Sequence, residues 1–279
     1  MDMNVRDCHF DVIAVAGQSN AEGYAIGTGD RIYHNDSVFQ LTDSSLMTCG
    51  GNLEECLKNY QTPSGFEICH ASYRKADFGV YVDLSESFAE QYIRSGALGK
   101  NRKLLIIKAA VGSTGFAPYH WGVGNSLHRR LTDMIDHALS LNAENRLVAL
   151  LWHQGEYNAF EQPELDLQTR EKLYYSAFKT MAEDLRDRYH IPDLPILAGE
   201  MVNDWADRYP DVTAAIETAT ERVCSDIGHA AIVSSEGLCS NAQAVSWSSD
   251  VIHFCADSIE ELGRRYFALY RSIVGVNAI

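Results

Sequence analysis

Three side chains of this sequence could together carry out covalent acyl transfer: Ser19, His253 and Asp250. A histidine can remove the proton of a serine hydroxyl, while a carboxylate fixes the imidazole tautomer and stabilises the imidazolium that forms. Asp250 and His253 are three residues apart, so one loop can direct both side chains into the same cleft. Taken singly, His253 would more often be a surface or capping histidine, and Asp250 a helix cap. The combination with Ser19 is what favours catalysis.

Ser19 follows a mainly apolar run over residues 10–16. A run of this kind predicts a strand in the middle of a sheet, because neither of its faces can lie in water. Gly17 and Gly23 supply the backbone freedom for a tight turn directly after the strand. In open α/β sheets the chemistry lies at the carboxyl ends of the strands. Ser19 is therefore expected at that edge of the sheet.

Amide groups near two other strand ends could stabilise the oxyanion of a tetrahedral intermediate. Gly112 and Ser113 follow the second expected buried strand, and Gln154 follows the third. Because the carboxyl ends of parallel strands meet at one edge of a sheet, these groups should converge with Ser19. We expect the donors to be the N–H of Ser19, the N–H of Gly112 or of Ser113, and the side-chain amide of Gln154.

Strand-like and helix-like segments alternate along the chain. Strands are expected over residues 10–16, 103–111, 146–152, 194–200 and 230–234, and a further short strand-like run at 38–41 lies in a long irregular region. Amphipathic helices are expected over residues 84–96, 126–140, 174–189, 210–223 and 259–273. Right-handed crossovers between such strands build a parallel sheet with helices on both faces. The sequence thus predicts an α/β protein with a five-stranded parallel sheet, in one domain over residues 1–279.

Charge and composition narrow the possible partners. The formal net charge of −15 argues against nucleic acid and anionic lipid as partners, since both would be repelled. No run of 18 apolar residues and no secretory signal is found, so we expect no membrane span and a cytoplasmic location. The seven cysteines are odd in number and form no CxxC pair, which favours free thiols in a reducing compartment.

Four short blocks of the sequence resemble the SGNH hydrolases. The blocks are Gly17-Gln18-Ser19-Asn20, the glycine turn at 112, His153-Gln154-Gly155-Glu156 and Asp250-Val251-Ile252-His253. Over residues 10–270 the chain looks like the sialate O-acetylesterase and acetylxylan esterase group of carbohydrate esterases. This resemblance implies a three-layer α/β/α, flavodoxin-like fold, a Ser-His-Asp triad, no metal and no other cofactor. It also implies the removal of acetyl groups from sugar hydroxyls, with a small-molecule or oligosaccharide acetyl ester as substrate.

The sequence departs from the usual pattern of that group at two positions. Ser113 stands where a second glycine is usual, so either Gly112 or Ser113 could supply the oxyanion N–H. Ala21 stands where methionine is common, which leaves room near the nucleophile. Neither departure removes a member of the triad.

Four further side chains are expected to bind the substrate: Gln18, Asn20, Trp121 and Glu156. Trp121 could stack on a sugar ring or serve as hydrophobic cover. Glu156 could shape the pocket on the oxyanion side, or be a strand-end carboxylate that binds loop amides. Two other functions stay open, a lipase or thioesterase with a long apolar acyl groove and a catalytically silent carbohydrate-binding protein. The intact serine, histidine and aspartate favour the esterase.

Overall fold

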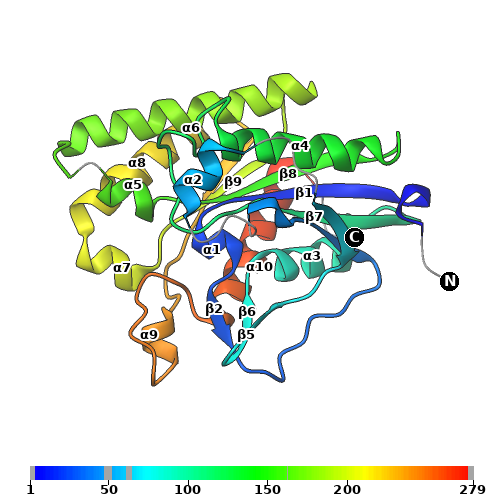
Figure 1. Cartoon of the computed structure of the whole chain (residues 1–279), viewed down its shortest axis with the longest axis horizontal. Coiled ribbons are helices and arrows are strands. Elements are labelled where there is room, and N and C mark those ends of the chain that lie inside the picture. Colours follow the sequence, from blue (N-terminus) through cyan, green and yellow to red (C-terminus); the bar gives the residue numbers. More distant parts are fainter. Residues whose placement is uncertain (1–3, 47–51, 61–64, 162, 276–279) are drawn as a thin grey trace.

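The computed structural model describes residues 4–46, 52–60, 65–161 and 163–275. Its central element is a seven-stranded sheet with the strand order β10-β9-β8-β1-β7-β3-β4 (Figure 1). The strands are β1 (His9–Gly17), β3 (Val38–Asp43), β4 (Phe66–His70), β7 (Arg102–Lys108), β8 (Arg146–His153), β9 (Ile196–Gly199) and β10 (Ala230–Val233). All neighbouring strands are parallel except β3 and β4, which are antiparallel. The predicted α/β class is confirmed, whereas the prediction of five parallel strands is wrong.

The two additional strands lie at one edge of the sheet. β3 contains the short run at 38–41 and pairs in parallel with β7. β4 is the edge strand, and none of its residues is buried. An edge strand that faces solvent needs no continuous apolar run, because water can satisfy its outer side. β4 therefore has no apolar pattern from which it could be predicted.

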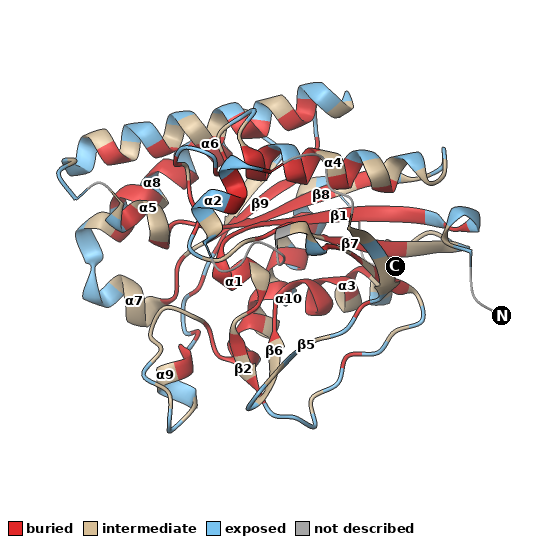
Figure 2. Cartoon of the chain, in the orientation of Figure 1, coloured by how far each residue is buried: buried red, intermediate tan, exposed pale blue. Residues whose placement is uncertain are grey.

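Helices cover both faces of the sheet and complete a three-layer fold (Figure 1). One layer contains α4 (Ser126–Ser140), α6 (Leu167–Tyr189) and α8 (Pro210–Ile227), and the opposite layer contains α3 (Ser85–Arg94) and α10 (Ala256–Val274). Successive side chains of β1 alternate between the two interiors: Val12 packs in the core under α4, α6 and α8, and Ile13 in the core under α3 and α10. β1 is thus buried on both faces, as Figure 2 shows.

A small second sheet lies beside the carboxyl end of β1. It is antiparallel, has the order β2-β6-β5, and consists of β2 (Ala25–Gly27), β5 (Arg74–Ala76) and β6 (Gly79–Val82). The short helices are α1 (Ser19–Glu22), α2 (Leu53–Lys58), α5 (Glu156–Phe160), α7 (Asn203–Arg208) and α9 (Asn241–Ala244), with 3-10 turns at Val5–Asp7 and Ser44–Leu46. α1 follows β1 directly and leads into β2, so it holds Ser19 between the two sheets.

The prediction of free thiols is wrong at Cys56. Cys56 in α2 is disulfide-bonded, although the sequence has no CxxC spacing to indicate it. The free cysteines of the described residues are Cys8, Cys69, Cys224, Cys239 and Cys255.

None of the described helices combines the length and the apolar composition that crossing a membrane would require.

Candidate active site

The ends of the central strands are joined by backbone hydrogen bonds at the point where Ser19 emerges. The N–H of Gln18 donates to His153 O at 2.9 Å, and the N–H of Val111 donates to Gly17 O at 3.1 Å. Gly17 has a φ of 124°, and a Cβ there would lie 2.0 Å from His153 O. Only glycine permits this approach, and it turns the chain so that Ser19 begins α1.

Ser19, His253 and Asp250 are brought together as the sequence predicts. Ser19 Oγ lies 2.8 Å from His253 Nε2, and His253 Nδ1 lies 2.7 Å from Asp250 Oδ2. Asp250 Oδ2 also accepts from Asn241 Nδ2 at 2.9 Å, while Oδ1 accepts from the backbone N–H groups of Ile252 and His253. Burial alone would raise the pKa of Asp250, but the hydrogen bonds from His253 and Asn241 lower that pKa below its ordinary value. Asp250 is therefore a carboxylate that can hold the imidazole in one orientation.

Asn20 ties the loop that carries His253 to the rest of the site. Its Nδ2 donates to Glu156 Oε1 at 2.8 Å and to Ile252 O at 3.0 Å, and its Oδ1 accepts from Phe254 N. Asn20 and Glu156 are each 2% exposed, and burial raises the pKa of Glu156. Neither side chain lines the cleft at Ser19, so their contact with the substrate stays a prediction. Asn20 binds the residues on either side of His253, and Glu156 in turn holds Asn20.

Gln18 and Gln154 form a second internal network. Gln154 Nε2 donates to Gln18 Oε1 at 3.2 Å and to Thr114 O at 3.1 Å, so both of its hydrogens are used. Gln18 Oε1 also accepts from Tyr157 N at 3.0 Å. The predicted role of the Gln154 amide as an oxyanion donor is thus not available in this arrangement. Gln18 borders the cleft at Ser19 but is itself only 2% exposed.

A carboxylate that the sequence analysis missed binds one of the expected oxyanion donors. The N–H of Gly112 donates to Glu22 Oε2 at 2.6 Å, and Glu22 Oε1 lies 3.3 Å from an Arg74 nitrogen. Burial raises the pKa of Glu22, and the nearby Arg74 opposes that rise. The N–H groups of Ser19 and Ser113 have no acceptor among the residues that the structure describes. The only sequence signal for Glu22 was its place one helical turn after Ser19.

Ser19 and His253 open onto a cleft of about 570 Å³. Its lining residues are Gln18, Ser19, Glu22, Tyr24, Leu53, Val111, Gly112, Ser113, Ile252 and His253. The Tyr24 ring stacks on the His253 ring, with the centroids 5.1 Å apart and the planes 21° apart. Tyr24 thereby covers one face of the imidazole and limits its rotation. Tyr24 is a further residue of the site that no sequence pattern identified.

Trp121 does not reach the cleft. It is fully buried, its Nε1 donates to Thr114 Oγ1 at 2.9 Å, and its ring packs edge-on against Trp152 at 5.2 Å. Of the two interpretations from the sequence, stacking on a sugar is wrong and hydrophobic cover is right. The position of Trp121 in a polar loop suggested an exposed ring, but the core encloses the side chain.

The described residues also line two other cavities, one of which adjoins the cleft at Ser19. The first, of about 410 Å³, shares Glu22, Leu53 and Val111 with the cleft at Ser19. Its buried cations are already paired with carboxylates: Lys108 with Asp83 and Glu86, and Arg130 with Asp43.

No group of three or more His, Cys, Asp or Glu side chains in the described part of the chain is arranged to hold a metal ion.

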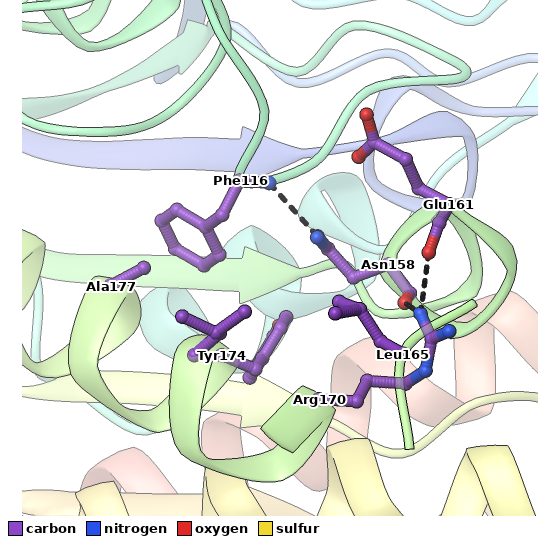
Figure 3. Close-up of a pocket in the computed structure, with 8 residues that line it drawn as sticks. Phe116, Asn158, Glu161, Leu165, Arg170, Tyr174 and Ala177 are labelled. Carbon is purple, nitrogen blue, oxygen red and sulfur yellow. Dashed lines mark hydrogen bonds between the residues drawn. The ribbon is translucent and has the colours of Figure 1, made fainter. Parts of the chain in front are cut away.

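The other cavity is smaller, about 290 Å³, and lies between α5 and α6 (Figure 3). Phe116 and Tyr174 form part of its wall, and Arg170 donates to the backbone carbonyls of Asn158 and Glu161. These contacts tie the start of α6 to the end of α5. The cavity contains none of the three catalytic candidates.

The fold and the sequence together define the class of protein. Residues 9–272 match the family described as "Carbohydrate esterase, sialic acid-specific acetylesterase", so the protein is a carboxylic ester hydrolase that acts on carbohydrate esters. The chain belongs to this sialic acid-specific acetylesterase family. The predicted resemblance to carbohydrate esterases is thus confirmed. A comparison with curated protein sequences gave no match.

Three solved structures share the fold over nearly the whole chain. NanS has a TM-score of 0.70 and 18% identity, with 96% of this chain and 97% of NanS covered. A protein from Arabidopsis thaliana has a TM-score of 0.65 and 17% identity, with 95% and 98% covered. A carbohydrate acetylesterase from Xanthomonas citri has a TM-score of 0.61 and 15% identity, with 96% of this chain and 57% of that protein covered. At these identities the likeness concerns the fold.

Proposed function

We propose that the protein removes O-acetyl groups from sugars through a triad of Ser19, His253 and Asp250. The observation that carries the proposal is the continuous contact of 2.8 Å and 2.7 Å from the serine hydroxyl through the imidazole to the carboxylate, at an open cleft. A neutral imidazole in this position can accept the serine proton through Nε2 while Nδ1–H donates to Asp250. Membership of a carbohydrate esterase family supplies the substrate class.

The reaction proceeds in two halves. Ser19 Oγ attacks the acetyl carbonyl carbon as His253 Nε2 takes its proton, and the carbonyl oxygen becomes an oxyanion. The bond to the sugar oxygen then breaks, His253 returns the proton to that oxygen, and the acetyl group stays on Ser19. Water next attacks the acetyl-serine with His253 again as base. Collapse of the second intermediate releases acetate and restores Ser19.

We assign the oxyanion hole to the N–H groups of Ser19 and Ser113. These two amides have no acceptor among the described residues, whereas Gly112 N–H donates to Glu22. Preorganised backbone donors stabilise the developing oxyanion without further reorganisation. Ser113 has a φ of 57°, an uncommon conformation for a residue other than glycine. Ser113, which replaces the usual second glycine, thus still adopts a positive φ and keeps its N–H available as a donor.

The cleft suits a short acyl group. Its aliphatic lining in the described part of the chain is limited to Leu53, Val111 and Ile252, beside several polar groups. Such a surface accommodates the methyl group of an acetyl ester but offers no extended apolar groove for a long acyl chain. The observation favours an acetylesterase over a lipase.

Replacement of the nucleophile tests the proposal. Ser19→Ala should retain the fold and lower kcat for acetate release from acetylated sialic acid and acetylated xylose by about 10⁴-fold or more. Ser140→Ala is the matched control, because Ser140 is exposed at the end of α4 and belongs to no part of the site. Acetate release by Ser19→Ala within tenfold of the wild type would overturn the assignment. Faster hydrolysis of palmitate than of acetate esters by the wild type would overturn the substrate class.

A further inference from the structure

We propose that a strip of aromatic side chains beside the triad binds the sugar chain of an acetylated oligosaccharide. The strip consists of Tyr24, Tyr81, Phe78 and Trp247. This inference rests on the proposed function and extends it, because it assigns a glycan chain rather than a free monosaccharide as the preferred substrate. It also gives the protein a binding subsite that extends from the catalytic cleft at Tyr24.

The strip is a continuous series of ring contacts that begins at the catalytic imidazole. Tyr24 stacks on His253 at 5.1 Å, and Tyr81 lies 5.2 Å from Tyr24. Phe78 lies 5.2 Å from Tyr81, and Trp247 lies 5.3 Å from Phe78. Each step is a packed ring pair, so the four side chains define one surface that leads away from the bond to be cleaved.

Three separate segments of the chain build this surface. Tyr24 lies between α1 and β2, and Trp247 lies in the loop after α9. Phe78 lies in the turn between β5 and β6, and Tyr81 lies in β6. Figure 1 shows the small sheet and α9 on the same side of the molecule, below the large sheet. The loop of Trp247 also carries Asp250, so the strip and the triad share their support.

The outer end of the strip is open to solvent. Trp247 is 63% exposed and Phe78 is 42% exposed, whereas Tyr24 and Tyr81 are partly buried. Leaving large apolar rings in water costs free energy, and grouped exposed aromatics commonly mark binding sites. The C–H groups on the face of a pyranose ring form an apolar surface that packs on such rings, while its hydroxyls stay in water. The position beside an esterase cleft makes a sugar chain the fitting occupant.

A cation beside the inner end of the strip adds polar contacts. The guanidinium of Arg74 lies 4.7 Å from the Tyr24 ring centre and 4.8 Å from that of Tyr81. It donates to Gly23 O and Glu22 Oε1, which fixes its plane between the strip and the cleft. The guanidinium covers one face of the Tyr24 ring and His253 covers the other, so the ring faces offered to a sugar are those of Phe78 and Trp247. The strip therefore has a polar inner end and an apolar outer end.

The test compares chain and monosaccharide substrates in outer-strip variants. Acetate release is measured on acetylated xylo-oligosaccharides and O-acetylated sialyllactose, each paired with its acetylated monosaccharide. Trp247→Ala and Phe78→Ala should each lower the ratio of kcat/KM for chain over monosaccharide by about three- to tenfold, mainly through KM. Trp247→Tyr should restore most of the ratio, because a flat ring is kept. Phe160→Ala is the matched control: Phe160 is also 42% exposed but packs with Trp205 and Tyr209.

The outcomes separate this inference from the proposed function. An unchanged ratio in both outer-strip variants, with the wild type active on acetylated sugars, overturns the inference and leaves the proposed function intact. An equal fall of the ratio in Phe160→Ala also overturns it, since the effect would not belong to the strip. A wild type that releases no acetate from any of these sugars contradicts the proposed function itself. A displaced Asp250 would lower kcat on the acetylated monosaccharide as well, so an effect of Phe78→Ala confined to the chain substrate belongs to the strip.

Discussion

Replacement of Asp250 by asparagine tests the proposed triad, because the structure shows what each orientation of the amide would meet. Asp250 Oδ2 faces two donors, His253 Nδ1 and Asn241 Nδ2, and Oδ1 faces the backbone N–H groups of Ile252 and His253. An amide has only one oxygen, so Asp250→Asn must turn its NH₂ group toward one of these pairs. Both choices place a donor against donors.

The balance between the two orientations sets the magnitude. With the NH₂ group on the Oδ1 side, two backbone N–H groups lose their acceptor. With the NH₂ group on the Oδ2 side, only the Asn241 amide loses its acceptor. His253 is still satisfied there, because it can switch to the tautomer in which Nδ1 carries no proton and accepts from the NH₂ group. One unpaired buried donor costs about 1–3 kcal/mol, which favours the second orientation by about 5- to 150-fold. In that orientation Nε2 carries the proton and cannot accept the one from Ser19.

Loss of the negative charge adds to this effect. A carboxylate stabilises the imidazolium of the transition state, and hydrogen bonds to charged groups contribute about 1 kcal/mol more than neutral ones. Together the two effects predict a fall in kcat of about 10²–10³-fold for Asp250→Asn, with little change in KM. Steady-state acetate release from an acetylated monosaccharide measures both constants, and a thermal melt checks that the variant is folded.

Glu156→Gln is the matched comparison, because it makes the same chemical change at the other buried acid of the site. Glu156 Oε1 accepts from Asn20 Nδ2, and a glutamine oxygen can keep that contact. The expected loss in kcat is about tenfold or less. If Glu156→Gln proves the more damaging variant and Asp250→Asn is nearly silent, the reasoning about the tautomer is refuted. The triad would then have to be redrawn with Glu156 as its acid.

Two further predictions concern the frame of the site. Asn20→Ala removes the hydrogen bonds to Ile252 O and from Phe254 N. It should lower the free energy of unfolding by about 1–3 kcal/mol in urea melts, and lower kcat by about tenfold because His253 is misplaced. Unchanged values of both would contradict the role of Asn20 in holding the His253 loop. Burial lowers the pKa of His153 to about 3, so this side chain stays neutral in the folded protein at pH values where the unfolded chain, with an imidazole pKa of about 6.5, binds a proton. Stability should therefore fall as the pH drops below about 6.5, by up to about 1.4 kcal/mol per pH unit from this group. His153→Asn should show a shallower decline between pH 6.5 and 5 than the wild type, and equal slopes would contradict this account.

The parts of the fold that the sequence predicted are those with an unmistakable burial pattern. β1, β7 and β8 are central strands covered on both faces, so their apolar runs stand out in the chain. α4 was predicted with its observed bounds, because its apolar residues recur at helical spacing. β4 could not be predicted, since its pairing with β3 rather than its composition makes it a strand. Tertiary pairing of this kind leaves no trace in local sequence.

Within the site, sequence order indicated which segments meet but not where their side chains point. The spacing of Asp250 and His253 limits their geometry enough for the contact to be predicted. Trp121 and Gln154 have no such constraint, and the packing around them turned both inward. Glu22 was missed because its partner Gly112 is 90 residues away along the chain.

The hydrogen bonds among Gln18, Gln154, Asn20 and Glu156 limit which side chains can determine substrate specificity. Gln18 and Gln154 bind each other, and Asn20 binds Glu156 and the loop of His253, so these polar side chains hold the frame of the site. A frame of this kind positions the nucleophile and base for any acetyl ester that enters. Discrimination between esters then has to come from groups that border the cleft and remain accessible. Among the described residues, Glu22 and Tyr24 border the cleft and lie outside the blocks that made the esterase recognisable, and the proposed aromatic strip begins at Tyr24.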